Sequence, residues 1–320
     1  MKFIFTRYAP LILFAALLAL FGWRAPRFLS GANFLNILIQ SASVAIVATG
    51  MTFVLLTAGI DLSVGSVMFI AAALAGKLVL SGQPLWLACA AIVLTGIACG
   101  ALNALFITRW RIVPFIVTLA TLYAGRGFGL WLTETRALNL PESILRIGTA
   151  RVAGLPFPVL MLVIIVVLAH FTLTRTSFGR QIYATGNDAE TARKAGINVV
   201  RVQFAVYVIS GLCAALGGLV AVAQLGAVSP TFGNQREFAA IAAAVLGGAS
   251  LFGGRGHVLP GTFIGALLIQ TVESGLVMMN ADPYLYPLVM SAIIFVAVWL
   301  DSVRREQWQR GQLRRIRPAT

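Results

Sequence analysis

The chain has 320 residues, of which 59% are hydrophobic and 11% are charged, and its mean hydropathy is +0.91. Soluble domains carry about 25% charged residues, so this composition excludes a soluble globular protein and indicates an integral membrane protein. The apolar runs are long and do not alternate, which predicts helices rather than a β-barrel. The net charge of +14 would suit nucleic-acid binding in a soluble protein, but here it fits arginines in cytoplasmic loops.

Ten apolar segments predict an all-α, polytopic protein with about ten transmembrane helices in a single domain, residues 1–320. The first segment resembles a signal sequence without a clear cleavage site, so we expect an uncleaved helix. The expected helices are Ala9–Trp23, Phe34–Leu56, the segment from the Gly59–Ser66 break to Leu80, Leu85–Ile107, Ile112–Leu132, Phe157–Leu173, Val202–Ala223, Phe238–Phe252, Val258–Met279 and Tyr284–Leu300.

Basic residues predict the orientation of these helices. With the N-terminus inside, the inner segments hold sixteen Lys and Arg residues and the outer segments seven. Positive charge gathers on cytoplasmic loops, so both termini are expected in the cytoplasm. The polar loop at residues 174–201 and the basic tail at residues 301–320 are then cytoplasmic as well.

Asp61 is the one acidic residue before Glu134, and it lies in GMTFVLLTAGIDLSVG, residues 50–65. A carboxylate at the membrane centre costs roughly 2.5–3.5 kcal/mol. In one interpretation Asp61, Ser63 and Ser66 satisfy backbone groups that are freed where one helix ends and the next begins. In the other, Asp61 is a ligand for cargo or protons in a pathway. The predicted topology places Asp61 near the inner face, which favours the cap and hinge.

A weak internal repeat places a second helix break near the C-terminus. GIDLSVGSVMFI (59–70) and RGHVLPGTFIGA (255–266) superpose at an offset of 196. Such an echo suggests a duplicated half, as in many transporters, although chance is the alternative because glycine is common in membrane helices. The residues of interest at the two breaks are Gly59, Asp61, Ser63, Gly65, Gly256 and Gly261.

Catalytic and metal-binding patterns are absent from the sequence. It lacks GxxxxGK[ST], GxSxG and an Asp-rich loop, and its two histidines have no partner constellation. The three cysteines fall in apolar runs and predict neither a disulfide nor a metal site. GRGFG at residues 125–129 lies in an apolar helix, where close helix packing is the better interpretation. We therefore expect no catalytic residues.

The inner loop SFGRQIYATGNDAETARKAGINVVRVQF, residues 177–204, contains a predicted turn and a short helix. The turn is Thr185-Gly186-Asn187, and the helix runs from Asp188 to Ala195. Asp188 suits the N-cap, and the charged residues Glu190, Arg193 and Lys194 suit the helix dipole. Gly196 is a natural C′ residue. The segment could be a docking element or an ordinary solvated connector.

Three motifs, in order, resemble the permease subunit of bacterial ribose-type ABC transporters, the monosaccharide-uptake family that works with periplasmic binding proteins. They are NFLNILIQSASVAIVATGMTFVLLTAGIDLSVGS (33–66), FGRQIYATGNDAETARKAGINV (178–199) and AVLGGASLFGGRGHVLPGTFIGALLI (244–269). The resemblance extends over essentially the whole chain. Many members have two glycines before the residue equivalent to Asn187, whereas this chain has one.

The resemblance implies a transport subunit in the bacterial inner membrane that binds no cofactor itself, because ATP and Mg belong to a partner ATPase. It implies that residues 185–197 form the coupling helix, with Thr185, Gly186, Asn187, Asp188, Glu190, Arg193 and Gly196 against two cytoplasmic ATPase subunits. It also implies a second permease copy or a paralogue. A periplasmic sugar-binding protein is expected on the Arg136–Arg151 and Gln224–Glu237 loops.

Polar groups in membrane segments are the candidates for sugar contact: Gln40, Ser41, Thr52, Asn103 and Gln270. Three alternatives remain open. The cargo could be branched-chain amino acids or another small polar solute. The protein could be a secondary transporter that uses Asp61 as a proton relay. It could also be a scaffold or an enzyme subunit, although it has no large extramembrane segment.

Overall fold

The computed structural model describes residues 2–316, and nearly all of its regular structure is helical. Seven of the described helices are long and apolar enough to cross a membrane. A polytopic all-α membrane protein is therefore confirmed, whereas the number of ten crossings stays a prediction. Residues 317–320 of the predicted basic tail lie outside the described residues, as do the side chains of Lys2, Arg7 and the tail arginines.

Most helices begin and end within a few residues of the predicted limits, because long apolar runs bounded by polar or glycine-containing segments define them locally. The elements are α1 (Lys2–Arg24), α2 (Gly31–Leu56), α3 (Val64–Leu80), α4 (Leu85–Arg109), α5 (Pro114–Thr133), β1 (Leu138–Asn139), α6 (Glu142–Thr149), β2 (Arg151–Val152), β3 (Leu155–Pro156), α7 (Phe157–Arg175), α8 (Ser177–Asn187), α9 (Ala189–Lys194), α10 (Val199–Leu225), β4 (Ala227–Val228), α11 (Arg236–Leu246), the π-helical turn η1 (Val258–Thr262), α12 (Phe263–Met278) and α13 (Leu285–Ile316).

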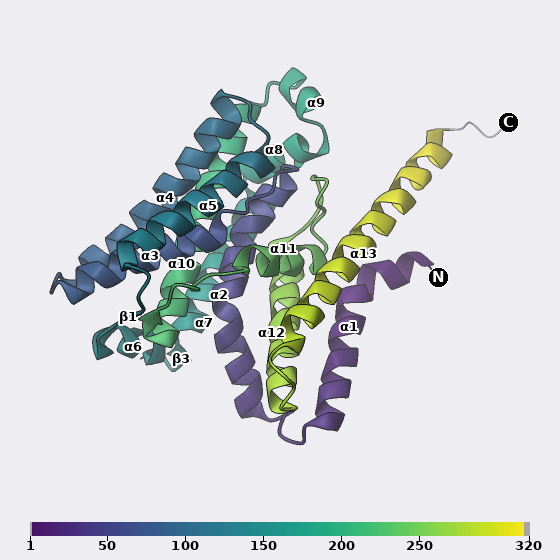
Figure 1. Ribbon diagram of the computed structural model, residues 1–320. Helices are drawn as coiled ribbons and strands as arrows, with labels where there is room; N and C mark the ends of the chain where they lie inside the picture. The colour runs from purple at the N-terminus through teal and green to yellow at the C-terminus, as the bar shows by residue number, and fades with distance from the viewer. Residues whose placement is uncertain (1, 317–320) are drawn as a thin grey trace.

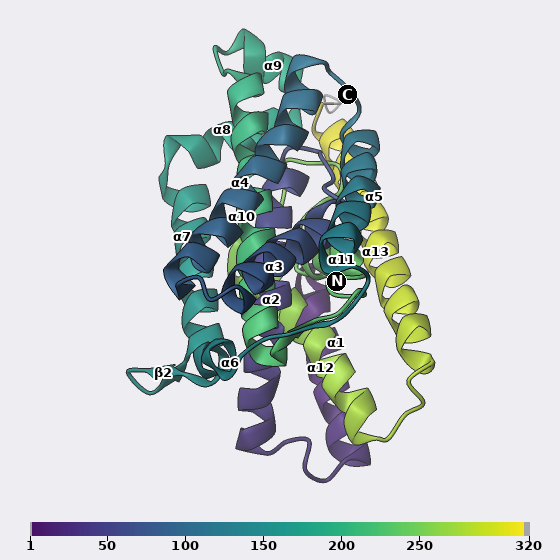
Figure 2. The same cartoon turned by 60° about the vertical axis from the view of Figure 1, so that its left-hand side comes forward.

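The connections gather at two opposite ends of the helix bundle (Figures 1 and 2). The α9 end carries α8, α9, the α4–α5 connection and the end of α13. The α6 end carries α6, the α1–α2 connection and the α12–α13 connection. The loops predicted on the inner side therefore gather at the α9 end, and the loops predicted on the outer side gather at the α6 end. At the α6 end β1 pairs with β4 and β2 with β3, both antiparallel, so the two loops expected to receive a binding protein are joined by β1–β4 pairing.

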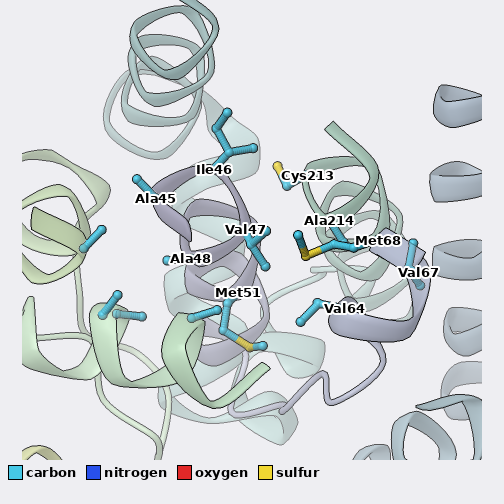
Figure 3. Close-up of a cluster of buried hydrophobic side chains, with 14 of the residues drawn as sticks. Ala45, Ile46, Val47, Ala48, Met51, Val64, Val67, Met68, Cys213 and Ala214 are labelled. Atoms are coloured by element: carbon cyan, nitrogen blue, oxygen red, sulfur yellow. The ribbon is translucent and has the colours of Figure 1, made fainter. Parts of the chain in front are cut away.

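The core lies where α2, α3 and α10 meet (Figure 3). Ala48, Met51 and Met68 are at most 1% exposed there. Glycines let backbones approach closely between α4 and α10, since a methyl group on Gly96 would lie 2.6 Å from the carbonyl oxygen of Gly211. This is the packing role of small residues in membrane helices. The lipid-facing sides of α4, α5, α7 and α13 are apolar and exposed.

The segment predicted as a spanning helix at Phe238–Phe252 is shorter in the structure. It forms α11, which has 11 residues and is therefore about 16 Å long at 1.5 Å per residue, half of a bilayer core. It crosses the middle of the molecule (Figure 1). Gly248 has φ +97° and Gly253 has φ +85°, conformations that a right-handed helix cannot include. The following helix is also irregular at its start, because Leu259 is extended inside η1.

Candidate functional site

A cavity of about 610 Å³, lined by both polar and apolar side chains, lies in the half of the bundle nearer the α6 end. That size falls within the roughly 300–1,000 Å³ of small-molecule sites. A second cavity, of about 420 Å³, shares four of its lining residues and continues it. The polar side chains around the first cavity come from α2, α10, α11, α12 and the α6 region: Asn36, Gln40, Ser43, Thr149, Arg151, Gln224, Arg236, Gln270 and Glu273.

Side-chain amides form a connected row on the wall of this cavity. Gln270 Nε2 donates to Gln40 Oε1 at 3.2 Å, and Gln40 Nε2 donates to Asn36 Oδ1 at 3.3 Å. Asn36 and Gln40 are four residues apart and so lie on one face of α2. Gln224 Nε2 donates to the backbone oxygen of Ile39 at 2.8 Å. Each amide has both donors and acceptors, and some of these remain free for a ligand with hydroxyl groups.

Three charged side chains line the 610 Å³ cavity: Arg151, Arg236 and Glu273. Arg236 and Glu273 also line a third cavity, of about 690 Å³, between α11 and α13. Tyr286 donates to the backbone oxygen of Glu273 at 2.9 Å and so fixes this part of α12 against α13. Glu273 was not among the predicted site residues. A sequence signal for it exists, because a carboxylate inside an apolar segment marks a candidate functional site, as it does at Asp61.

The structure separates the five predicted pathway residues. Gln40 and Gln270 meet at the cavity, although 230 positions apart in the chain. The other three are buried and hydrogen-bonded within the protein. Ser41 donates to the Leu38 carbonyl at 2.9 Å, Thr52 pairs with Thr262 at 2.7 Å, and Asn103 Nδ2 donates to Ser63 at 2.8 Å. A role in sugar contact stays a prediction for Gln40 and Gln270, and has no geometric support for the other three.

Asp61 lies fully buried between α2 and α3. Its Oδ1 accepts from the Ser63 amide at 3.0 Å and the Ser63 hydroxyl at 2.6 Å, and its Oδ2 accepts from the Ser210 hydroxyl of α10 at 2.7 Å. Asn103 donates to Ser63 and accepts from Thr121 at 2.6 Å, so the network joins α3, α4, α5 and α10. Asp61 lines none of the three cavities above. This geometry favours the hinge interpretation.

Glycines at the predicted helix breaks make close contacts. Gly59 faces the Tyr207 hydroxyl, and Gly256 and Gly261 face the backbones of Ala249 and Gly247. Gly65 has the most crowded surroundings, because a methyl group there would overlap with Glu237 Oε2 and with the Gly233 carbonyl, and would lie 3.2 Å from Arg126 Nη2. Arg126 also donates to the Phe232 carbonyl and stacks over the Phe69 ring at 5.5 Å. Gly65, at the start of α3, thus lies against the buried carboxylate of Glu237 and close to the half-buried guanidinium of Arg126.

The capped short helix of the inner loop has the predicted form. Asp188 accepts from the amides of Glu190 and Thr191, each at 2.9 Å. The Thr191 amide chiefly holds the pKa of Asp188 below its usual value. Lys194 and Glu190 form an ion pair at 2.9 Å. Gly196 has φ +84° and follows the helix end. Helix α9 lies at one end of the molecule (Figure 1), and its charged side chains Glu190, Arg193 and Lys194 are exposed.

The predicted turn at Thr185-Gly186-Asn187 is wrong. These residues complete α8, and the chain changes direction at Asp188, whose backbone is extended. Glycine and asparagine favour turns locally. Here Gly186 is instead required by tertiary packing, because a methyl group at this position would overlap with the Leu56 carbonyl. Thr185 and Gly186 are buried, so the exposed part of the predicted coupling segment starts at Asn187.

Comparison with known proteins gives consistent matches. Residues 33–298 match the family model described as "Branched-chain amino acid transport system / permease component". The ribose import permease protein of Haemophilus influenzae is 37% identical over 89% of this chain and 90% of its own length. The D-allose transport system permease protein of Escherichia coli is 36% identical over 93% of this chain and 92% of its own length. The xylose transport system permease protein of Escherichia coli is 33% identical over 92% of this chain and 92% of its own length. No solved structure matches.

Within the described residues, no group of three or more His, Cys, Asp or Glu side chains is placed to hold a metal ion.

Proposed function

The chain belongs to the family of transport-system permease components, and from this we propose that it is the membrane-spanning subunit of an ATP-driven importer for a monosaccharide of the ribose, xylose or galactose class. The observation that carries the proposal is the set of relatives that match about nine-tenths of the chain and are named for ribose, allose and xylose. The chain itself acts as a transport subunit, and ATP hydrolysis takes place on partner subunits.

The chemistry of the amide-lined cavity supports a sugar as cargo. Sugar hydroxyl groups both donate and accept hydrogen bonds, as do the side-chain amides of Asn36, Gln40, Gln224 and Gln270.

The working transporter contains two permease subunits, either two copies of this chain or this chain with a paralogue, in the bacterial inner membrane with the α9 end in the cytoplasm. Two ATPase subunits dock on the exposed surface of α9. A periplasmic sugar-binding protein docks on the joined loops at the α6 end. ATP-driven closure of the ATPases moves α8 and α9 as a rigid body and opens the cavity alternately to the two sides.

A carrier that uses Asp61 as its proton relay is the alternative. It requires that Asp61 reach the pathway, whereas both oxygens of Asp61 accept hydrogen bonds from protein groups in a site with no solvent exposure. The two mechanisms differ in energy source, and this makes them separable by experiment.

Uptake in liposomes tests the proposal. The chain is co-expressed with a candidate partner ATPase and a candidate sugar-binding protein from the same organism, reconstituted, and supplied with labelled ribose, xylose, galactose or leucine. We expect uptake of a monosaccharide that requires both enclosed ATP and the binding protein and that persists when a protonophore is added. Uptake of leucine alone would refute the cargo. Uptake that collapses with the proton gradient and ignores ATP would refute the mechanism.

A further inference from the structure

Helix α8 lies between the exposed helix α9 and the two helix breaks. The first break follows the end of α2 at Leu56, and the second lies between α11 and η1. Gly186, in the last turn of α8, packs directly on the carbonyl of Leu56, the final residue of α2. A methyl group on Gly186 would also lie 2.6 Å from the amide nitrogen of Gly254. The same glycine therefore contacts the first break, which follows α2, and the second break, which precedes η1.

Tyr183 makes an independent tie from α8 to the second break. Its hydroxyl donates to the Gly256 carbonyl at 2.7 Å. Tyr183 and Gly186 are three residues apart, so they share one face of α8. The two breaks are also bonded to each other, because the Gly254 amide donates to the Leu56 carbonyl at 3.0 Å. Gly253 also packs here, since a methyl group on it would lie 2.6 Å from the Gly186 oxygen. We call this meeting point of α8 with the two breaks the junction.

The junction continues toward the cavity along two helices. From the first break α2 leads to Gln40, and from the second break α12 leads to Gln270, which donates to Gln40 at 3.2 Å. Near the junction, Thr52 of α2 and Thr262 of η1 share a hydrogen bond of 2.7 Å. Opposite the junction, Asp301 of α13 accepts from the Leu251 amide at 3.0 Å. The loop between α11 and η1 is thus held on both sides.

These contacts leave little room for independent movement. Backbone packed on backbone at glycine has no side chain that could change rotamer and absorb a displacement, and packed interiors transmit strain rather than dissipate it. A rigid-body movement of α8 must therefore shift the ends of α2 and η1 together. The exposed helix α9 follows α8 directly, because Asp188 is both the C-cap of α8 and the N-cap of α9.

We propose that α8 transmits ATPase movement to both helix breaks at once, with Tyr183 and Gly186 as positioning residues for alternating access. This inference rests on the proposed function, because it assumes that an ATPase moves α9. Tyr183 is half-buried, Gly186 is buried, and neither residue lines the three cavities described above.

Conservative variants in the reconstituted transporter test this role. Tyr183→Phe removes only the hydroxyl that reaches Gly256, and Gly186→Ala inserts a methyl group between the two breaks. The matched controls are Tyr123→Phe, at a tyrosine that is 69% exposed on α5, and Gly31→Ala, at a glycine with no atom within 4 Å of the added methyl group. The measurements are labelled sugar taken up per ATP hydrolysed and the amount of ATPase that co-purifies with the chain.

We expect Tyr183→Phe to retain the ATPase subunits and the ATPase rate while sugar uptake per ATP falls several-fold, and Gly186→Ala to show the same change more strongly if it assembles. Both controls should match the wild type. Unchanged uptake per ATP in Tyr183→Phe would overturn the inference. Equal losses of uptake and ATPase rate together with loss of the ATPase subunits would also overturn it, since that result means a purely structural role. Failure of the wild-type complex to couple uptake to ATP would instead refute the proposed function.

Discussion

Removal of the Ser210 hydroxyl tests whether Asp61 is a structural hinge. Ser210 donates to Asp61 Oδ2 at 2.7 Å, both residues have no solvent exposure, and Ser210→Ala creates almost no cavity. A hydrogen bond to a charged group contributes about 1.5–3 kcal/mol. We therefore expect Ser210→Ala to lower the free energy of unfolding by about 2 kcal/mol, which corresponds to a Tm about 3 °C lower for a chain of this size.

The assay is thermal unfolding of the purified chain in detergent, combined with a double-mutant cycle. In an Asp61→Asn background the charge-assisted bond is already gone, so Ser210→Ala should cost at least about 1 kcal/mol less there than in the wild type. Ser81→Ala is the control, because its hydroxyl makes only an exposed bond to the Leu78 carbonyl at 2.8 Å. Asp61→Asn itself should reduce assembly or expression without changing sugar preference.

Two results would refute this reasoning. Equal costs of Ser210→Ala in both backgrounds would mean that the serine and Asp61 are not energetically coupled. Normal assembly of Asp61→Asn together with a changed substrate preference or pH profile would place Asp61 in the pathway. The second result would revive the proton-relay alternative.

Three further outcomes are expected. Gln270→Leu should raise the sugar KM up to about tenfold in reconstituted uptake, since one hydrogen bond contributes about 0.5–1.5 kcal/mol. The control Ser41→Ala should leave KM unchanged. Equal KM values for both variants would contradict the assignment of Gln270 to the cavity. Glu190→Lys reverses a charge on the exposed face of α9 and breaks the ion pair with Lys194. The chain should still fold, but ATP hydrolysis should be uncoupled from uptake. Normal uptake would count against α9 as the docking surface. Gly65→Ala should greatly reduce the yield of folded protein because its methyl group overlaps with a buried carboxylate, while Gly127→Ala, with no neighbour within 4 Å, should not; similar yields would contradict the packing argument.

Features that depend on neighbours in the chain were predictable. The short helix α9 is one example, since Asp188 caps amides two and three residues away and Glu190 pairs with Lys194 four residues on. The ends of α2 and α4 are others, because a long apolar run that meets glycine or proline defines a helix end with little help from the rest of the protein.

Features that depend on distant contacts were missed or wrongly predicted. Gly186 reads locally as a turn residue, yet it continues α8 because only glycine fits against Leu56, 130 positions earlier. The predicted spanning helix at Phe238–Phe252 stops at Leu246, where the chain turns through left-handed glycines. Glu273 had the same local signal as Asp61, but its place at a cavity with Arg236 depends on how α11 and α12 pack.

An all-α membrane protein, helix breaks near Asp61 and Gly256, and a capped helix in the loop at residues 177–204 all follow from local sequence. Hydrophobic transfer energy, backbone conformation and helix capping act over a few residues, and their pattern can therefore be read directly. The folded protein was needed to show which polar groups meet at the cavity, that Asp61 is enclosed by donors from other helices, and that α8 contacts both breaks. Those contacts link positions 130 to 230 residues apart, and their partners are set by the packing of whole helices, which local sequence does not encode.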